Sequence, residues 1–243
     1  MPRLCALILA SLYLFIGVAI TPQNAVAELT DKDRSEIKQI ISTFIAENPE
    51  LIRDVLTELA LAEQAAREQA AFSLVRNDAG DPSIGKNQAT VTIYEFSDYN
   101  CGYCKRVFAD LQAVLAEQPD VKLVIKEFPI LAESSVVAAK AGIAAHRQGK
   151  FPEFHRAMMT WRGRIDDAAI RSAAEDAGLD LTRLQADMED EETLSILTRT
   201  QAAASALDIR GTPALVIGDR LIPGAISKTE ILDLINQARA AKN

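Results

Sequence analysis

Two cysteines, Cys101 and Cys104, lie two residues apart where the hydrophobic pattern changes from that of a strand to that of a helix. From Ala89 the apolar residues follow a period of two, which is typical of a β-strand. Directly after the first cysteine, the pattern predicts a helix from about Gly102 to Gln118. A cysteine pair between a strand and the helix that follows it restricts the chain to folds of the α/β class.

The remaining elements support a layered α/β fold. A near-continuous apolar run at 121–128 predicts a central strand that is buried on both faces, and Pro129 ends it. Residues 133–207 form a helical block, and Ala214 begins a third strand that turns into a short fourth one. Ser227 and Glu230 form a capping box that opens the last helix. The order of strand, helix, strand, helical insertion, strand, strand and helix predicts a mixed sheet covered on both faces.

The first 27 residues have the pattern of a signal peptide. Arg3 precedes an uncharged apolar run over 4–20, and Ala25-Val26-Ala27 forms a small-residue cleavage site. The alternative is a retained membrane anchor. Cleavage would remove Cys5, one of three cysteines, and leave only the paired ones in an oxidising compartment outside the inner membrane. We therefore expect a periplasmic protein.

Residues 28–80 predict two amphipathic helices. Thr30 and Asp33 form a capping box, and Asn48-Pro49 marks the start of the second helix. The polar break at 77–82 separates this segment from residues 81–243. We expect the segment to self-associate into a dimer or trimer, although it could instead fold back onto its own catalytic domain. The apolar stripes that need covering comprise Ile37, Ile40, Ile41, Phe44, Ile45, Ile52, Val55, Leu56 and Leu59.

The position of the cysteine pair indicates redox chemistry. At a helix N-terminus, free backbone N–H groups and the helix dipole stabilise a thiolate, so Cys101 is the expected nucleophile. Cys104 lies one turn further on and is placed to resolve a mixed disulfide, while Lys105 and Arg106 add positive charge. The alternatives are a structural disulfide, which would close a very small loop, and half of a zinc site. The chain has only two histidines and no second pair of closely spaced cysteines, so we expect no metal and no cofactor.

Two further positions are candidates for the site. Glu95 shares a strand face with Val91 and Ile93, where burial would raise its pKa and let it accept a proton from Cys104. The alternative is that this face is less buried, or that Lys126 pairs with Glu95 structurally. Thr212-Pro213 precedes the third strand, where a cis proline is plausible. We expect His146 and His155 to be surface or structural residues.

These motifs together resemble the DsbA-like thioredoxin superfamily over residues 85–241. The resemblance implies a thioredoxin fold with a helical insertion. It also implies that Cys101 is the exposed nucleophile, Cys104 the resolving thiol, Glu95 a buried acid and Pro213 a cis proline that faces the site. The helical extension over 28–80 is similar to the oligomerising stalk of the suppressor-of-copper-sensitivity protein C (ScsC) group.

The residues between the cysteines separate the possible functions. Gly102 and Tyr103 replace the Pro-His pair of DsbA oxidases; this pair, with Thr212 before the proline, resembles the isomerase DsbC. The resemblance therefore favours a disulfide isomerase or reductase that acts on misfolded secreted proteins and is kept reduced by a membrane thiol reductase. The alternatives are an oxidase of the DsbA type, with a membrane oxidase as partner, and a copper-binding protein that uses both thiols. The net charge of −8, without a basic cluster, argues against a nucleic-acid partner.

Overall fold

The computed structural model describes residues 28–241 as two units. The first unit ends at Glu58 and the second begins at Leu59, so the boundary falls inside a helix. The predicted signal peptide and its Cys5 lie outside the described residues. Over the described range, no helix has the length and apolar character that crossing a membrane would require.

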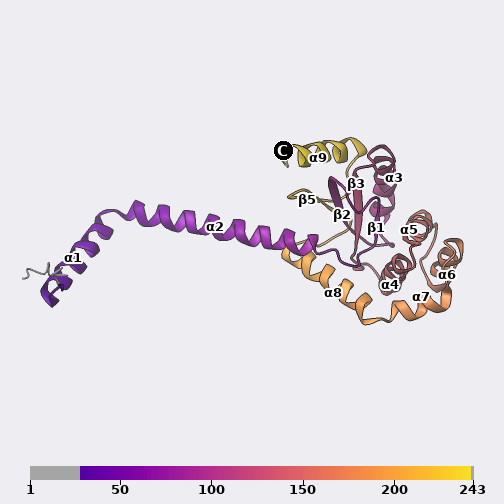
Figure 1. Cartoon of the computed structure of the whole chain (residues 1–243), viewed down its shortest axis with the longest axis horizontal. Helices are drawn as coiled ribbons and strands as arrows, with labels where there is room; N and C mark the ends of the chain where they lie inside the picture. Colours follow the sequence, from indigo (N-terminus) through magenta and orange to yellow (C-terminus); the bar gives the residue numbers. More distant parts are fainter. Residues whose placement is uncertain (1–27, 242–243) are drawn as a thin grey trace, which may run out of the picture. The chain divides into compact units, whose positions relative to one another are not determined.

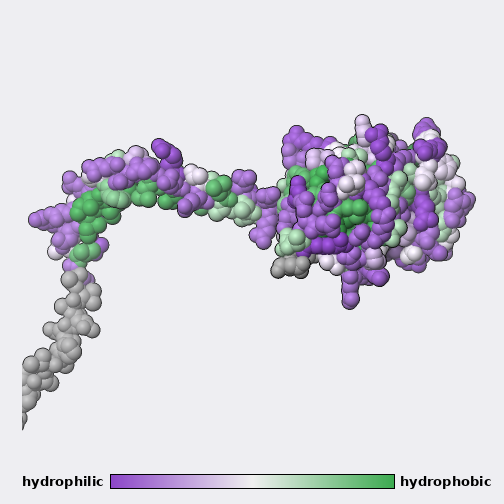
Figure 2. All heavy atoms as spheres, turned by 90° about the horizontal axis from the view of Figure 1, so that it is seen from above, coloured by the Kyte–Doolittle hydropathy of each residue, from purple (hydrophilic) through white to green (hydrophobic). Residues whose placement is uncertain are grey.

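The first unit consists of helix α1 (Asp31–Glu47) and the beginning of helix α2 (Pro49–Arg76). The predicted capping box between Thr30 and Asp33 is present at the start of α1, and α2 begins at the predicted proline. None of the residues of α1 is buried. Figure 2 shows hydrophobic residues, drawn in green, gathered along α1 and the start of α2. This unit therefore leaves its apolar stripe exposed.

The second unit is built on a five-stranded mixed sheet of order β1-β3-β2-β4-β5. Strand β2 (Val91–Ser97) runs parallel to β3 (Val121–Glu127) and antiparallel to β4 (Ala214–Ile217). Strand β5 (Arg220–Pro223) completes the hairpin with β4. Strand β1 (Ser83–Ile84), antiparallel to β3, was not predicted, because two residues are too few to show a period. The mixed sheet confirms the predicted fold class.

Helices cover both faces of this sheet, as Figure 1 shows. Helices α3 (Gly102–Glu117) and α9 (Lys228–Ala240) pack on the face that carries Ile93, while α8 (Glu191–Ala206) and the end of α2 pack on the face that carries Phe96. The predicted helical insertion comprises α4 (Glu133–Arg147), α5 (Phe151–Thr160), α6 (Asp167–Asp176), α7 (Leu181–Met188) and α8. A third core cluster joins the insertion to both cysteines.

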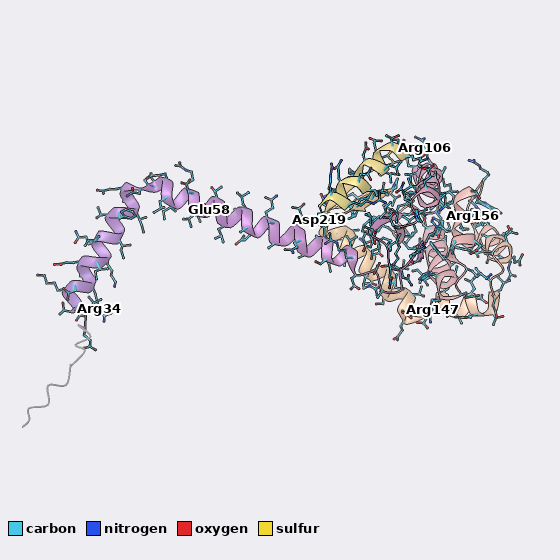
Figure 3. All side chains as sticks on the ribbon, turned by 45° about the horizontal axis from the view of Figure 1, so that its top comes forward. Arg34, Glu58, Arg106, Arg147, Arg156 and Asp219 are labelled. Atoms are coloured by element: carbon cyan, nitrogen blue, oxygen red, sulfur yellow. The ribbon has the colours of Figure 1, made fainter. Side chains whose placement is uncertain are left out.

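The end of α2 belongs to the second unit, which differs from the expected separation at 77–82. Phe72 and Val75 are buried in the core. Arg76 donates a hydrogen bond of 3.1 Å to the carbonyl of Gly218 and pairs with Asp219, which Figure 3 labels beside the end of α2. The compact unit therefore begins at Leu59 rather than after residue 80. The local sequence could not reveal this, because these partners are distant in the chain.

Candidate active site

Cys101 occupies the N-cap of α3, as predicted. Its backbone is extended, with φ −81° and ψ 115°, and its Sγ accepts a hydrogen bond of 3.4 Å from the N–H of Cys104. Both cysteines are free thiols and both are buried. The N–H of Cys104, one of the backbone donors that the first helical turn leaves without a carbonyl partner, therefore points toward the Cys101 sulfur.

Cys101 also contacts the loop before β4. Its thiol donates a hydrogen bond of 3.2 Å to the carbonyl oxygen of Thr212, and the Thr212–Pro213 peptide bond is cis, as predicted. Of the predicted substrate-binding pair, Thr212 thus contacts Cys101 directly, and Pro213 follows it in the same loop. A groove of about 460 Å³ begins here, lined by Pro213 together with Tyr103, Arg106, Asp110 and Ile226.

The two cations that follow the cysteines are engaged elsewhere. Lys105 donates a hydrogen bond of 3.0 Å from its Nζ to the carbonyl of Trp161. The guanidinium of Arg106 lies 4.9 Å from the centre of the Tyr103 ring, and that ring is 59% exposed. Arg106, labelled in Figure 3, therefore lines the groove together with Tyr103.

Glu95 is buried, with 1% of its surface exposed. Burial raises the pKa of its carboxyl to about 8, although a hydrogen bond of 3.0 Å from the Ser97 hydroxyl opposes the rise. The alternative pairing with Lys126 does not form, because Lys126 aligns with Phe96 in the β2–β3 register and so lies on the other face of the sheet. Lys126 instead forms a buried ion pair with Asp81. Glu95 can therefore hold or release a proton near neutral pH.

Cys104 lies deeper in the core than Cys101. Burial raises the pKa of its thiol far above the usual range, and the neighbouring charge of Glu95 raises it further. The Ser97 side chain and the Asp98 backbone act in the opposite direction through hydrogen bonds. Cys104 therefore stays protonated until a base removes its proton.

A buried polar network next to the site was not predicted. The Tyr99 hydroxyl donates to Glu127 at 3.0 Å and lies 3.1 Å from Nδ1 of His155. Burial lowers the pKa of His155 to about 3, so the ring is neutral, in line with a structural role. A Cβ on Gly142 would lie 2.6 Å from the Glu127 carboxylate, so this helical glycine makes room for the network. Periodicity could not reveal it, because its members come from separate elements.

Asp98 organises the loops around Cys101. Its carboxylate accepts hydrogen bonds from the backbone N–H groups of Ile130 and Leu131 and from the Ser135 hydroxyl. The side chains of Ile130 and Leu131 remain exposed. Among residues 28–241, no group of three or more His, Cys, Asp or Glu side chains is arranged to hold a metal ion.

Comparison with known proteins agrees with this geometry. A family model described as a DSBA-like thioredoxin domain matches residues 92–236. A thioredoxin-like oxidoreductase from Silicibacter pomeroyi DSS-3 is 38% identical, with a TM-score of 0.66, over 69% of this chain and 96% of that chain. ScsC of Proteus mirabilis, in a transitional conformation, is 28% identical with a TM-score of 0.66. That match covers 88% of this chain and 99% of the ScsC chain, so it extends into the helices before residue 81.

Curated relatives match over shorter regions. The Na(+)/H(+) antiporter NhaA 3 of Salinispora tropica is 27% identical over 138 residues, 56% of this chain and 21% of the antiporter. The chain thus spans about a fifth of that relative's length. Disulfide bond formation protein D of Bacillus subtilis is 22% identical over 67% of this chain and 79% of that protein.

Proposed function

The chain belongs to the DsbA-like thioredoxin family, and from this membership we propose that it is a periplasmic disulfide isomerase or reductase for misfolded exported proteins. Its chemistry is that of a thiol–disulfide oxidoreductase. A match to a periplasmic thioredoxin-like protein from Salmonella enterica, 31% identical over 70% of this chain and 97% of that chain, supports the compartment.

The proposed reaction begins at Cys101. Its thiolate attacks one sulfur of a wrongly paired client disulfide, and the other client sulfur leaves as a thiolate. In isomerisation, a second client thiolate attacks the mixed disulfide and releases Cys101 unchanged. In reduction, Cys104 attacks Cys101 instead, which frees the client and leaves an internal disulfide that a membrane thiol reductase must reduce. Glu95 accepts the Cys104 proton in that step.

The groove beside the nucleophile is the proposed client site. The Thr212 carbonyl lies next to the Cys101 sulfur, and Pro213, Tyr103 and Ile226 provide apolar surface. An extended client segment bound there would present its disulfide to Cys101 and pair its backbone with that of Thr212.

The observation that carries the choice of isomerase is the exposed apolar stripe of the first unit. Ile40 is 67% exposed, Phe44 53% and Leu56 59%. A stripe of this kind is stable in water when a second surface covers it. We assign that surface to further copies of the chain, in a closed dimer or trimer that presents several Cys101 sites to one client. The match to ScsC across these helices supports this assignment.

Simple oxidation of clients is the second candidate. Cys101 lies at a helix N-terminus, the position at which strongly oxidising disulfide oxidoreductases carry their attacking cysteine. The similarity to disulfide bond formation protein D also supports an oxidase. In this case the membrane partner would be an oxidase, and the client would gain the disulfide that the protein loses.

Refolding of ribonuclease separates the two functions. The mature chain should recover activity from scrambled ribonuclease, which needs isomerisation, faster than from reduced ribonuclease, which needs oxidation. Ile40→Glu places a charge in the stripe and should yield monomers by light scattering that lose isomerase activity and retain oxidase activity. Gln39→Glu, on the adjacent exposed position of α1, is the matched control and should change neither. A monomeric wild-type protein that oxidises reduced ribonuclease efficiently would instead establish the oxidase function.

A further inference from the structure

The loop that follows β3 is fixed to the cysteine motif by one buried residue, Asp98. Oδ2 of its carboxylate accepts hydrogen bonds from the backbone N–H groups of Ile130 and Leu131, at 2.9 and 3.0 Å. Oδ1 accepts a hydrogen bond of 2.7 Å from the Ser135 hydroxyl. The backbone carbonyl of Asp98 accepts a hydrogen bond of 2.9 Å from the N–H of Cys101. A single residue therefore connects Cys101 to Ile130 and Leu131.

The strand order places this loop and the loop before β4 on the two sides of the cysteine motif. Strand β2 lies between β3 and β4 in the sheet. Because β3 runs parallel to β2, it ends at the same edge of the sheet, and the antiparallel β4 begins at that edge. An extended client segment that crosses Cys101 would therefore meet Pro213 on one side and the loop that carries Ile130 and Leu131 on the other.

Ile130 and Leu131 are apolar residues that the structure keeps in contact with solvent. Their side chains are 41% and 52% exposed, whereas Asp98 is 2% exposed. A rotation of the loop that buried them would break their hydrogen bonds to Asp98 and leave a buried carboxylate short of donors, which costs free energy. The residues that line the groove beside Cys101 come from α3, the 212–213 loop and the segment 224–227, so the Ile130–Leu131 pair is a separate surface.

We propose that the Ile130–Leu131 pair is a second client subsite, which binds apolar side chains of a misfolded client on the side of Cys101 away from Pro213, and that Asp98 is its positioning residue. This inference rests on the proposed function and adds a contact that selects the client. Because Cys101 bonds covalently to a client sulfur, the surface that adjoins it contacts the client too. The occupant is an unfolded segment, since a folded protein buries most of its large apolar side chains.

The chemistry of the Asp98 side chain explains why a carboxylate is needed at this position. Oδ1 also accepts a hydrogen bond of 2.8 Å from the backbone N–H of Asn100, so both oxygens accept from backbone donors. An asparagine side chain has nearly the same shape but only one acceptor oxygen. Whichever way its amide is turned, the NH2 group would face a backbone N–H. Asp98→Asn should therefore release the loop while it leaves Ile130 and Leu131 unchanged.

The test uses the reduced mature chain and symmetric disulfides of short peptides, in which the two sulfurs are equivalent. Each peptide has a single cysteine, with leucines before it, leucines after it, or serines on both sides. Attack by Cys101 releases one peptide as a thiol, and attack by Cys104 on the mixed disulfide releases the other and leaves the internal disulfide. The rate of thiol release gives a rate constant for each peptide. Division by the value for the serine peptide removes any effect of a substitution on the reactivity of Cys101 itself.

The wild-type protein should prefer both leucine peptides to the serine peptide. In Ile130→Ser/Leu131→Ser, the preference for one leucine peptide should fall by about 5 to 30 times, because the apolar surface that binds it is lost. The other leucine peptide, which reaches the groove at Pro213, should keep its preference. Asp98→Asn should lose the same preference as the serine variant, and the loss should raise the half-saturating peptide concentration.

The matched control is Leu194→Ser, which removes a leucine that is 44% exposed on α8 and should keep both preferences. Ile130→Ser/Leu131→Ser changes only exposed side chains and keeps both backbone N–H groups. It therefore decides the subsite even if urea unfolding shows that Asp98→Asn is not folded.

Other outcomes overturn the proposal in distinguishable ways. If Ile130→Ser/Leu131→Ser keeps both leucine preferences, the subsite fails and the proposed function stands. If light scattering shows that this variant forms a smaller assembly than the wild type, the pair is an interface between copies of the chain instead. If a folded Asp98→Asn keeps both preferences, the positioning role of Asp98 fails. If the wild-type protein releases no thiol from any of the three peptides, the proposed function itself fails.

Discussion

The Cys101 thiol donates a 3.2 Å hydrogen bond to the carbonyl oxygen of Thr212, although the two residues are 111 positions apart in the chain. The β2–β4 pairing creates this contact, because it brings the loop before β4 to the end of β2 that leads into the cysteine motif. Under the proposed function, this contact places the attacking sulfur directly beside the backbone that would pair with an extended client.

The two cysteines are expected to trap clients unequally. Cys104→Ala should accumulate mixed disulfides through Cys101, because nothing resolves them. Cys101→Ala should trap almost none, since the Cys104 thiol is fully buried and its pKa is raised by burial. Non-reducing electrophoresis of periplasmic extracts measures both. Equal trapping by the two variants would contradict the assigned roles.

Glu95 should make the reduced protein less stable as the pH rises. Its pKa is raised from 4.5 to about 8 on folding, so ionisation costs stability above pH 4.5, and the cost is complete above pH 8. By linkage, this cost is about 3 kcal/mol at pH 7. Glu95→Gln should therefore gain roughly 1–3 kcal/mol at pH 7 and flatten the pH dependence in urea unfolding. A Glu95→Gln variant less stable than wild type at pH 8 would contradict the inference that the ionised Glu95 carboxylate is buried without a compensating charge.

His155 should reduce the stability of the protein at acidic pH. Its pKa falls from 6.5 to about 3 on folding, so the unfolded chain binds the proton more readily and stability decreases below pH 6.5. The loss should be about 2 kcal/mol by pH 5. His155→Phe keeps an aromatic ring beside Tyr99 and Phe151 and should remove this part of the acid sensitivity. Urea unfolding at pH 5 and pH 7 measures the difference. If the variant loses as much stability between pH 7 and pH 5 as the wild type does, another group causes the loss.

The buried ion pair between Lys126 and Asp81 should be costly to break. Both side chains are 1% exposed, and burial raises the pKa of Asp81. Lys126→Met leaves that carboxylate uncompensated and should destabilise the protein by about 3–5 kcal/mol at pH 7. Adding Asp81→Asn should recover part of this loss.

A neighbouring, more exposed pair provides the control for this experiment. Lys122 lies 3.5 Å from Asp78 with both side chains partly exposed, so Lys122→Met should cost less than about 1 kcal/mol in urea unfolding. Similar losses for the two lysine variants would contradict the argument from burial.

The local pattern of the sequence was sufficient to predict most elements and the position of Cys101 at the start of a helix. The strand before Cys101, the helix after it, the helical insertion, the capping boxes and the α/β class depend on residues close together in the chain, where side-chain period and capping chemistry act directly. The N-cap position of Cys101 follows from the same local signals.

The tertiary structure decided which distant groups meet. Strand register placed Lys126 with Asp81 rather than Glu95, so Glu95 has a raised pKa without a cation beside it. Packing buried the end of α2 in the second unit, although a polar break follows it at 77–82. The Tyr99 network likewise depends on separate elements. Sequence period determines which face of an element is apolar, whereas register and packing determine which partner that face meets, and with it the charge state of each buried group.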